Sequence, residues 1–561
     1  MTSPLTKQRF LNSLSKGGLI ENAVLDEVIT IGNVNFYPRI TIVNCLFNYD
    51  IVFDSAEFIG SIEFIHCEFT GTISLLSCRN KPIRRTDSID SSEVENFLIF
   101  TKCTAQSVLI EECKFSNGLT FRDQCKIGRL KIRELNWYHY QNGTIPFMLE
   151  LDSSEFGMLQ FRNFVCHKLN LSSSSISDAI SGTDMKIGRF NIRKTVFKDC
   201  VIESLLECHL EIQDSVFKGV FRLESFDHLL DISNCAFEGE TDLYMPRFDA
   251  VLHLTNITLL MSLQVRGDQF KEIKIDGGNR MSGEARIYSS RILILLLENN
   301  FSQFDLTFEK NTFQDIYISN YISKGSLSLL NSKFKGENTA FSLIASDLGK
   351  AKLMNFSFKE CDSVTITDSF LSEISFTSTT WFTDNRMHSG RENYPEKRRE
   401  VYRQLKQAAE KQGDKINSLE FQARELKAFK KMLSCWSETS LNDRLILILS
   451  ETNDFGLSWL RPLWLLLVIT LIFYLLIVVS ISSTLKFAPA TNTDELATTL
   501  VLFLENSSIL IQMLNPAHNL SHMFSKNELT TSTYWLDGIH RIIAAFLLVQ
   551  IVSAFRKFVK A

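Results

Sequence analysis

The chain has 561 residues, of which 45% are hydrophobic and 22% charged, and 59 basic and 64 acidic residues give a formal net charge of −5. This balance provides neither the basic excess that favours binding to phosphate backbones nor the strongly acidic surface that mimicry of DNA requires. We therefore expect no nucleic-acid partner. The chain does not open with a charged segment followed by a short apolar run, so we also expect no cleaved signal peptide.

Apolar residues recur every 11 positions between residues 29 and 78, in a unit that reads I-x-F-x-x-C-x-F. A short period of this kind is typical of solenoids, in which each repeat stacks on its neighbours. Because alternate strand residues point to opposite faces, both members of each apolar-x-apolar pair face the same interior. The residues that we expect to form this β-helix core include Ile40, Phe47, Phe53, Phe58, Phe64, Cys67 and Phe69.

The pairs of one small and one large apolar residue, spaced five and six residues apart, resemble a degenerate form of the pentapeptide-repeat family. The resemblance implies an all-β solenoid, a right-handed quadrilateral β-helix, over residues 27–382, after an N-terminal cap over residues 1–26. Two units would make one coil, so roughly 16 coils stacked about 4.8 Å apart would form a rod on the order of 75 Å long. Four stretches break the phase and are expected to leave the coils as loops, namely 80–95, 136–146, 178–187 and 276–284.

The chain contains 12 cysteines, and half of them fall on the small-residue position of the repeat. Free cysteine behaves as a small buried hydrophobe, so we predict core positions rather than chemistry for Cys45, Cys67, Cys78, Cys103, Cys113 and Cys235. No CxxC zinc pair is present, and we expect no metal, no cofactor and no catalytic residue.

The composition becomes charged and helical after the repeats. Apolar stripes at spacings of three and four predict a helical hairpin over residues 383–438, followed by an elbow at the membrane interface over residues 439–460. Basic residues flank the apolar segments that follow, and we expect them to contact anionic lipid at the cytoplasmic surface. These basic residues are Lys427, Lys430, Lys431, Arg444, Arg461, Arg556 and Lys557.

The last hundred residues, 461–561, predict a transmembrane domain. Segments 463–482 and 537–556 are each close to the 20 apolar residues that a helix needs to cross the hydrocarbon core. Basic residues lie before the first segment and after the last, which favours cytoplasmic positions for both termini. We therefore expect a multi-pass protein of the cytoplasmic (inner) membrane.

A third apolar stretch, 496–514, lies between the two spans and carries polar residues at its centre. Three full spans would place the basic C-terminus outside, so the pattern predicts a re-entrant helix. The alternative is an amphipathic helix on the outer surface. If a pore exists, the candidate lining residues are Glu505, Asn506, Ser507, Asn515 and His518. His518 and His522 are four residues apart and would bind metal only weakly, so we interpret both as part of a solvated loop.

A span, a re-entrant helix and a second span resemble the pore unit of two-helix ion channels of the potassium-channel type, over residues 460–561. Those channels carry a T-x-G-Y-G filter, whereas this chain has no glycine between Gly456 and Gly538, so the resemblance does not extend to potassium selectivity. The strings FGLSWLRPLW, at 455–464, and AFRKF, at 554–558, resemble bacterial pentapeptide-repeat membrane proteins. That resemblance implies no activity.

Three functions fit these patterns. The first is a cytoplasmic β-helix that senses a signal or binds a partner protein and is coupled to an oligomeric pore or membrane-perturbing domain. Two spans cannot enclose a channel, so a pore would require a homo-oligomer. The second is a membrane-tethered protein-binding scaffold without conduction. The third is a β-helix carbohydrate-active enzyme, which we do not favour because no catalytic motif stands in a supporting context.

Overall fold

The computed structural model describes residues 3–32, 35–36, 39–80, 96–115, 118–137, 147–246, 248–278, 280–281, 283–299, 301–302, 305–388, 394–433, 441–481, 497, 501, 503–505, 507–523 and 529–559. The chain divides into two compact units, Met1–Met387 and His388–Ala561. The first is an all-β solenoid and the second is helical, as the sequence predicted.

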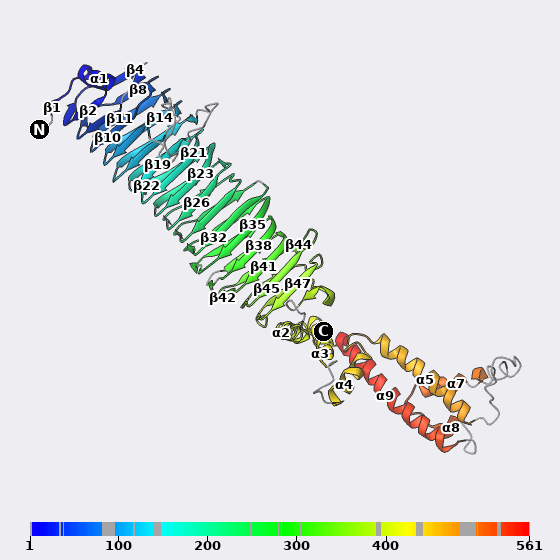
Figure 1. Ribbon diagram of the computed structural model, residues 1–561. Helices are drawn as coiled ribbons and strands as arrows, with labels where there is room; N and C mark the ends of the chain where they lie inside the picture. The colour runs from blue at the N-terminus through cyan, green and yellow to red at the C-terminus, as the bar shows by residue number, and fades with distance from the viewer. Residues whose placement is uncertain are drawn as a thin grey trace, which may run out of the picture. The chain divides into compact units, whose positions relative to one another are not determined.

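The first unit is a parallel β-solenoid of about 15 turns, whose strands stack in successive layers (Figure 1). The register shows how the repeat builds a turn, because Ile29 pairs with Ile51 and Ile51 with Ile73, an offset of 22 residues. Two 11-residue units therefore make one turn. The longest strands are β11 (Glu68–Leu76), β14 (Thr104–Glu111), β17 (Lys126–Arg133), β20 (Glu155–Arg162), β21 (Val165–Ser172), β22 (Ser175–Thr183), β23 (Met185–Arg193), β35 (Gln269–Asp276), β38 (Arg291–Glu298) and β41 (Thr312–Ser319).

The interior of the solenoid is filled by the apolar columns of the repeat. All seven predicted core residues are buried, with at most 3% of each exposed. Phenylalanine rings stack between turns, as for Phe197 and Phe217, whose centroids are 4.8 Å apart, and for Phe217 and Phe237, at 4.9 Å. Such pairs add to the free energy gained by removing the rings from water.

The cysteines of the described part of the chain are all free and buried, as predicted for the six on the repeat column. The Cys67 thiol lies 3.4 Å from the Ile42 carbonyl oxygen of the preceding turn. Burial raises the pKa of Cys235 to about 11, so this thiol stays protonated and unreactive at neutral pH. Core packing thus accounts for the positions of these cysteines.

The loop predicted at 178–187 is wrong. These residues belong to β22 and β23, which pair in parallel with the strands of neighbouring turns. The change of phase arises because the register shifts between Ile176 and Ala179, where β22 carries an irregularity against both neighbouring strands. One extra residue is thus absorbed within the strand rather than expelled from the coil. The predicted loops at 80–95 and 136–146 lie largely outside the described residues.

Some turns approach each other so closely that only glycine fits. A Cβ atom on Gly157, in β20, would lie 2.2 Å from the Gly128 carbonyl oxygen of β17. We expect Gly157→Ala to destabilise the solenoid by about 1–3 kcal/mol, because the contact is with backbone that cannot rotate away. Thermal unfolding followed by circular dichroism measures the effect. The matched control is Gly32→Ala, where the nearest neighbouring atom is 3.9 Å away, and equal midpoints for the two variants would contradict the argument.

The second unit consists of a helical hairpin and a group of apolar helices (Figure 1). Two of its helices are long and apolar enough to cross a membrane, Leu460–Ile481 and Thr531–Phe555. Its helices are α2 (Pro395–Lys411), α3 (Lys415–Met432), α4 (Leu441–Glu451), α5 (Leu460–Ile481), α7 (Ser507–Met513), α8 (Leu520–Met523) and α9 (Thr531–Val559).

Candidate functional site

The short helix α7 packs against α5, and the chain then reverses before α8. Ile509 and Met513 of α7 share an apolar cluster with Tyr474 and Ile477 of α5, whereas Leu514 packs beside Leu466 and Ala544, nearer the start of α5. Proceeding along α7 therefore leads back toward the first half of α5. In the reversal that follows, at residues 514–519, Leu514 and His518 contact the long apolar helices, whereas Asn515, Ala517 and Asn519 are exposed.

Ionisable side chains meet at this reversal. The Nε2 atom of His518 lies 2.6 Å from Oδ1 of Asp537, and Nη2 of Arg541 lies 2.6 Å from Oδ2 of the same carboxyl group. Only 3% of the His518 side chain and 5% of the Asp537 side chain are exposed. Asp537 and Arg541 are four residues apart on α9, which places them on the same helix face. We refer to His518, Asp537 and Arg541 as the polar triad.

A second buried histidine lies next to the polar triad. His540 is fully buried, its Nε2 atom lies 3.1 Å from the Thr470 hydroxyl oxygen of α5, and its ring centroid is 6.1 Å from that of His518. Its Nδ1 atom is buried without a hydrogen-bond partner among the described residues. Thr470 is the eleventh residue of the 22 in α5, so it lies about 15 Å from either end of that helix. His540 thus meets α5 near its middle, whereas Asp537 is the seventh residue of α9, about 9 Å from the start of that helix.

The exposed side of α7 and of the residues beside it carries four polar side chains, next to the exposed apolar side chains of Leu504 and Ile511. Glu505, Ser508, Gln512 and Asn515 follow one another at spacings of three, four and three residues, and each is exposed. Residues at these spacings lie on one side of a helix. We refer to these four residues as the α7 stripe. The Asn515 carbonyl oxygen also accepts a hydrogen bond from Nδ1 of His518, at 2.7 Å, so the end of the stripe is attached to the polar triad.

The five candidate pore-lining residues differ in their exposure. Glu505, Ser507 and Asn515 are exposed, whereas His518 is turned inward toward α9, and Asn506 lies outside the described residues. The solvated-loop interpretation is therefore wrong for His518, although His522 is exposed. The reason is the carboxylate of Asp537, which offers the imidazole a buried partner 19 residues further along the chain.

At the opposite end of the apolar helices, α3 is tied by ion pairs to the end of α4 and the turn after it. Lys430 pairs with Glu451, and Lys427 lies 3.0 Å from Asp454. Arg461, at the start of α5, lies 3.5 Å from the same Asp454 carboxylate. These three predicted interfacial cations are thus paired with carboxylates of the protein. Arg444 donates to the Leu433 carbonyl oxygen, and the side chains of Arg556 and Lys557 lie outside the described part of the chain.

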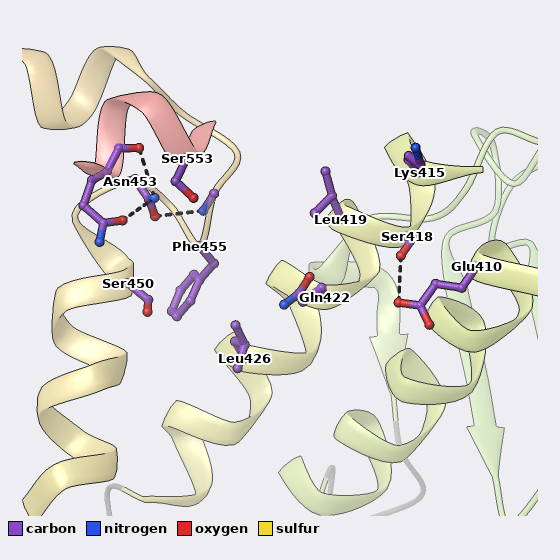
Figure 2. Close-up of a pocket in the computed structure, with 12 residues that line it drawn as sticks. Glu410, Lys415, Ser418, Leu419, Gln422, Leu426, Ser450, Asn453, Phe455 and Ser553 are labelled. Atoms are coloured by element: carbon purple, nitrogen blue, oxygen red, sulfur yellow. Dashed lines mark hydrogen bonds between the residues drawn. The ribbon is translucent and has the colours of Figure 1, made fainter. Parts of the chain in front are cut away.

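The same turn borders a cavity of about 610 Å³ between α3 and the end of α9. Figure 2 shows Glu410 and Ser418 on one side of the cavity and Asn453 and Ser553 on the other. Asn453 is buried, and its amide donates to the Gln550 side chain of α9 while its Oδ1 atom accepts from the Gly456 amide at 2.8 Å. The turn is therefore fixed to both α3 and α9, and we refer to residues 450–456 as the turn link.

The comparisons with known proteins leave the site to be interpreted from its own geometry. No family model, curated protein or solved structure matches the chain. Among the described residues, no group of three or more His, Cys, Asp or Glu is arranged to hold a metal ion.

Sequence reasoning missed Asp537, His540, Arg541 and Thr470. A signal was available, because the segment WLDGIHRII places three ionisable residues at the start of a predicted span. Ionisable residues within membrane helices are rare and usually functional. What the sequence could not show is that His518 meets Asp537 while His540 meets Thr470, 70 residues away in the chain.

Proposed function

We propose that this protein is a membrane-anchored β-solenoid whose C-terminal helices assemble with further copies of the chain into a pore. In this proposal α5 and α9 cross the membrane, α7 enters it from the outer side and leaves again at the reversal, and the solenoid lies in the cytoplasm. The polar triad is the observation that carries the proposal.

A simple anchor has no need for the polar triad. Ionised groups within membrane helices are costly, and in membrane proteins they usually face a protein interior or a water-filled path. Here they hold a reversal, which exposes backbone polar groups that lipid cannot satisfy. An anchor would cross the membrane more stably with two uninterrupted apolar helices, so we infer that the reversal serves another purpose.

The α7 stripe supplies that purpose. Its four polar side chains are exposed, and two of them, those of Ser508 and Gln512, lie on α7, whose opposite face packs on α5. Facing lipid, this stripe would be unfavourable, whereas around a shared axis the stripes of several copies would line a water-filled lumen. Glu505 is the only charged member of the stripe, so the lumen would favour cations.

The turn link suggests how the cytoplasmic part could act on the pore. The α2–α3 hairpin follows the solenoid in sequence, and α3 is ion-paired to the end of α4 and to the turn that leads into α5. A protein or signal that binds the solenoid and displaces the hairpin would therefore pull on both apolar helices. The partner would be a cytoplasmic protein or signal, recognised on the outer faces of the turns.

Ion flux through purified protein in liposomes tests the proposal. We expect cation flux for the wild-type protein, in the presence of cell extract if the pore is closed at rest. Glu505→Ala should weaken the preference for cations, and Glu505→Lys should shift the ratio of cation to anion permeability by about tenfold or more, because a ring of charges changes the local ion concentration by at least that factor.

The matched control is Leu504→Ala, which changes an exposed apolar neighbour of Glu505 and should leave the ion preference unchanged. Absence of flux under every condition, with the protein demonstrably inserted, would favour the tethered scaffold. Replacing the apolar helices with an unrelated membrane anchor then separates the alternatives, since a scaffold would keep its cellular function and a pore would lose it.

A further inference from the structure

A groove of about 500 Å³ lies between the end of α4 and the start of α5. Ile448 of α4 and Leu460, Trp464 and Leu465 of α5 give it largely apolar walls. Between 39% and 65% of each of these four residues is exposed, so the described part of the chain does not cover the groove. Its volume is within the range of about 300–1,000 Å³ that is typical of small-molecule sites. We refer to this feature as the α4–α5 groove.

The apolar walls of the α4–α5 groove continue onto the outer surfaces of both helices. On α4, Leu445, Ile446 and Leu449 are also exposed, and on α5 so are Leu467 and Val468. α5 is one of the two helices that are long and apolar enough to cross a membrane. A helix that exposes apolar side chains directly before such a span is suited to the membrane interface, where its apolar side meets acyl chains. The groove therefore opens onto a surface that is suited to lipid.

The charged groups at the groove have one positive charge in excess. Arg461 lines the groove, and 60% of its side chain is exposed. It shares the Asp454 carboxylate with Lys427, so two cations meet one anion there. The carboxylate that lines the groove, that of Glu451, is already paired with Lys430. A cation in excess beside an apolar groove favours a ligand that is both anionic and apolar.

We propose that the α4–α5 groove binds one acyl chain of an anionic phospholipid, with the phosphate of that lipid at Arg461. The apolar walls take the chain, and the excess charge selects the anionic headgroup. Free phosphate would leave the apolar walls uncovered, and a zwitterionic lipid balances its phosphate with its own ammonium group. Trp464 suits this position, because an indole ring is apolar but carries one N–H donor and is common at membrane interfaces.

The bound lipid would lie against the turn link. Glu451 and Thr452 line the groove and belong to the turn link, which ties α3 to α5 and α9. A lipid in the groove therefore contacts the segment through which the hairpin is joined to the apolar helices. The site requires that α5 enters a membrane, and it does not depend on conduction.

Native mass spectrometry of the full-length protein in detergent tests the site. The protein is titrated with phosphatidylglycerol, which is anionic, or with phosphatidylcholine, which is zwitterionic. We expect one phosphatidylglycerol per chain to bind about fivefold more tightly than phosphatidylcholine, because one basic residue near a membrane surface gives roughly this preference. Arg461→Gln should make the two affinities equal, whereas Arg461→Lys, which keeps the charge, should retain most of the preference.

Variants that fill the groove test the place of the acyl chain. Leu465→Trp and Ile448→Trp should each weaken the binding of phosphatidylglycerol by about tenfold or more, since a larger side chain occupies the volume of the chain. The matched controls lie on the same helices outside the groove. Leu467→Trp changes a residue as exposed as Leu465, and Leu445→Trp changes one as exposed as Ile448. Both controls should bind as the wild type does.

Equal wild-type affinities for the two lipids, or controls that lose as much affinity as the groove variants, would overturn the site. A lipid-free oligomer that Leu465→Trp dissociates would also overturn it, because a second copy of the chain then occupies the groove. If phosphatidylglycerol binds as expected but liposomes conduct no ions, the lipid site stands and the pore fails. If ions pass but the two lipids bind equally, the pore stands and the lipid site fails.

Discussion

Asp537→Ala should lower the free energy of unfolding of the helical unit by about 3–5 kcal/mol. The substitution removes the carboxyl group of a side chain that is 5% exposed and leaves two partners behind, the Arg541 guanidinium and the imidazole of His518. A buried charge without a partner costs more than the lost ion pair contributed, because its desolvation is no longer compensated. We expect a lower thermal midpoint in detergent and a smaller inserted fraction.

The matched control for this prediction is Asp537→Asn, which keeps the shape of the side chain and offers one acceptor to Arg541 and one donor to His518. It should lose less than half as much stability as the alanine variant. If the alanine and asparagine variants are equally stable, the polar triad is not a buried, mutually satisfied network, and apolar packing, including that of Leu514, holds the reversal.

The solenoid could be predicted because its repeat is local and its core is periodic. An 11-residue unit with apolar residues at alternating positions determines which side chains face inward, and stacking two units per turn then fixes the register, as the pairing of Ile29 with Ile51 shows. The shift beside Ile176 could not be predicted, because a single extra residue reads equally well as a loop or as a bulge. Only the neighbouring strands decide between the two.

The backbone conformation at the corners of the solenoid favours particular residue types, and this preference is independent of the apolar pattern of the core. Asn22, Asn44 and His66 recur at 22-residue intervals and all have φ close to +52°. Asparagine tolerates this left-handed region better than most residues, and histidine is also enriched there. The asparagines at this position, Asn22 and Asn44 and later Asn234 and Asn256, would therefore have located one corner of some turns from the sequence.

The candidate site was harder to predict, because its members come from three separate segments. Sequence reasoning identified the polar centre of the 496–514 stretch and included His518, but the partners of His518 lie on α9 and became visible only in the fold. Hydropathy identifies apolar segments by their average, and that average hides Asp537, His540 and Arg541 within a long apolar helix. A charge inside such a segment is the more informative observation.

Replacing the whole polar triad with apolar residues should separate its role in folding from its role in function. In the variant His518→Phe, Asp537→Leu, Arg541→Met, no buried charge lacks a partner. Apolar replacement of a buried ionic group is often neutral or stabilising. We therefore expect a thermal midpoint at or above that of the wild type, whereas Asp537→Ala alone falls well below it. Conduction should be lost, because the apolar variant no longer holds Asn515 through the imidazole of His518.

The two measurements together decide why the chain keeps charges between apolar helices. A stable, inserted triple variant that conducts no ions, or at least tenfold fewer than the wild type, would show that the triad serves the pore at some cost to stability. If the variant conducts normally, the triad is not needed for conduction, and the α7 stripe alone would have to account for it. If the triple variant unfolds as readily as Asp537→Ala, the triad is required for packing, because apolar side chains then cannot fill the space it occupies.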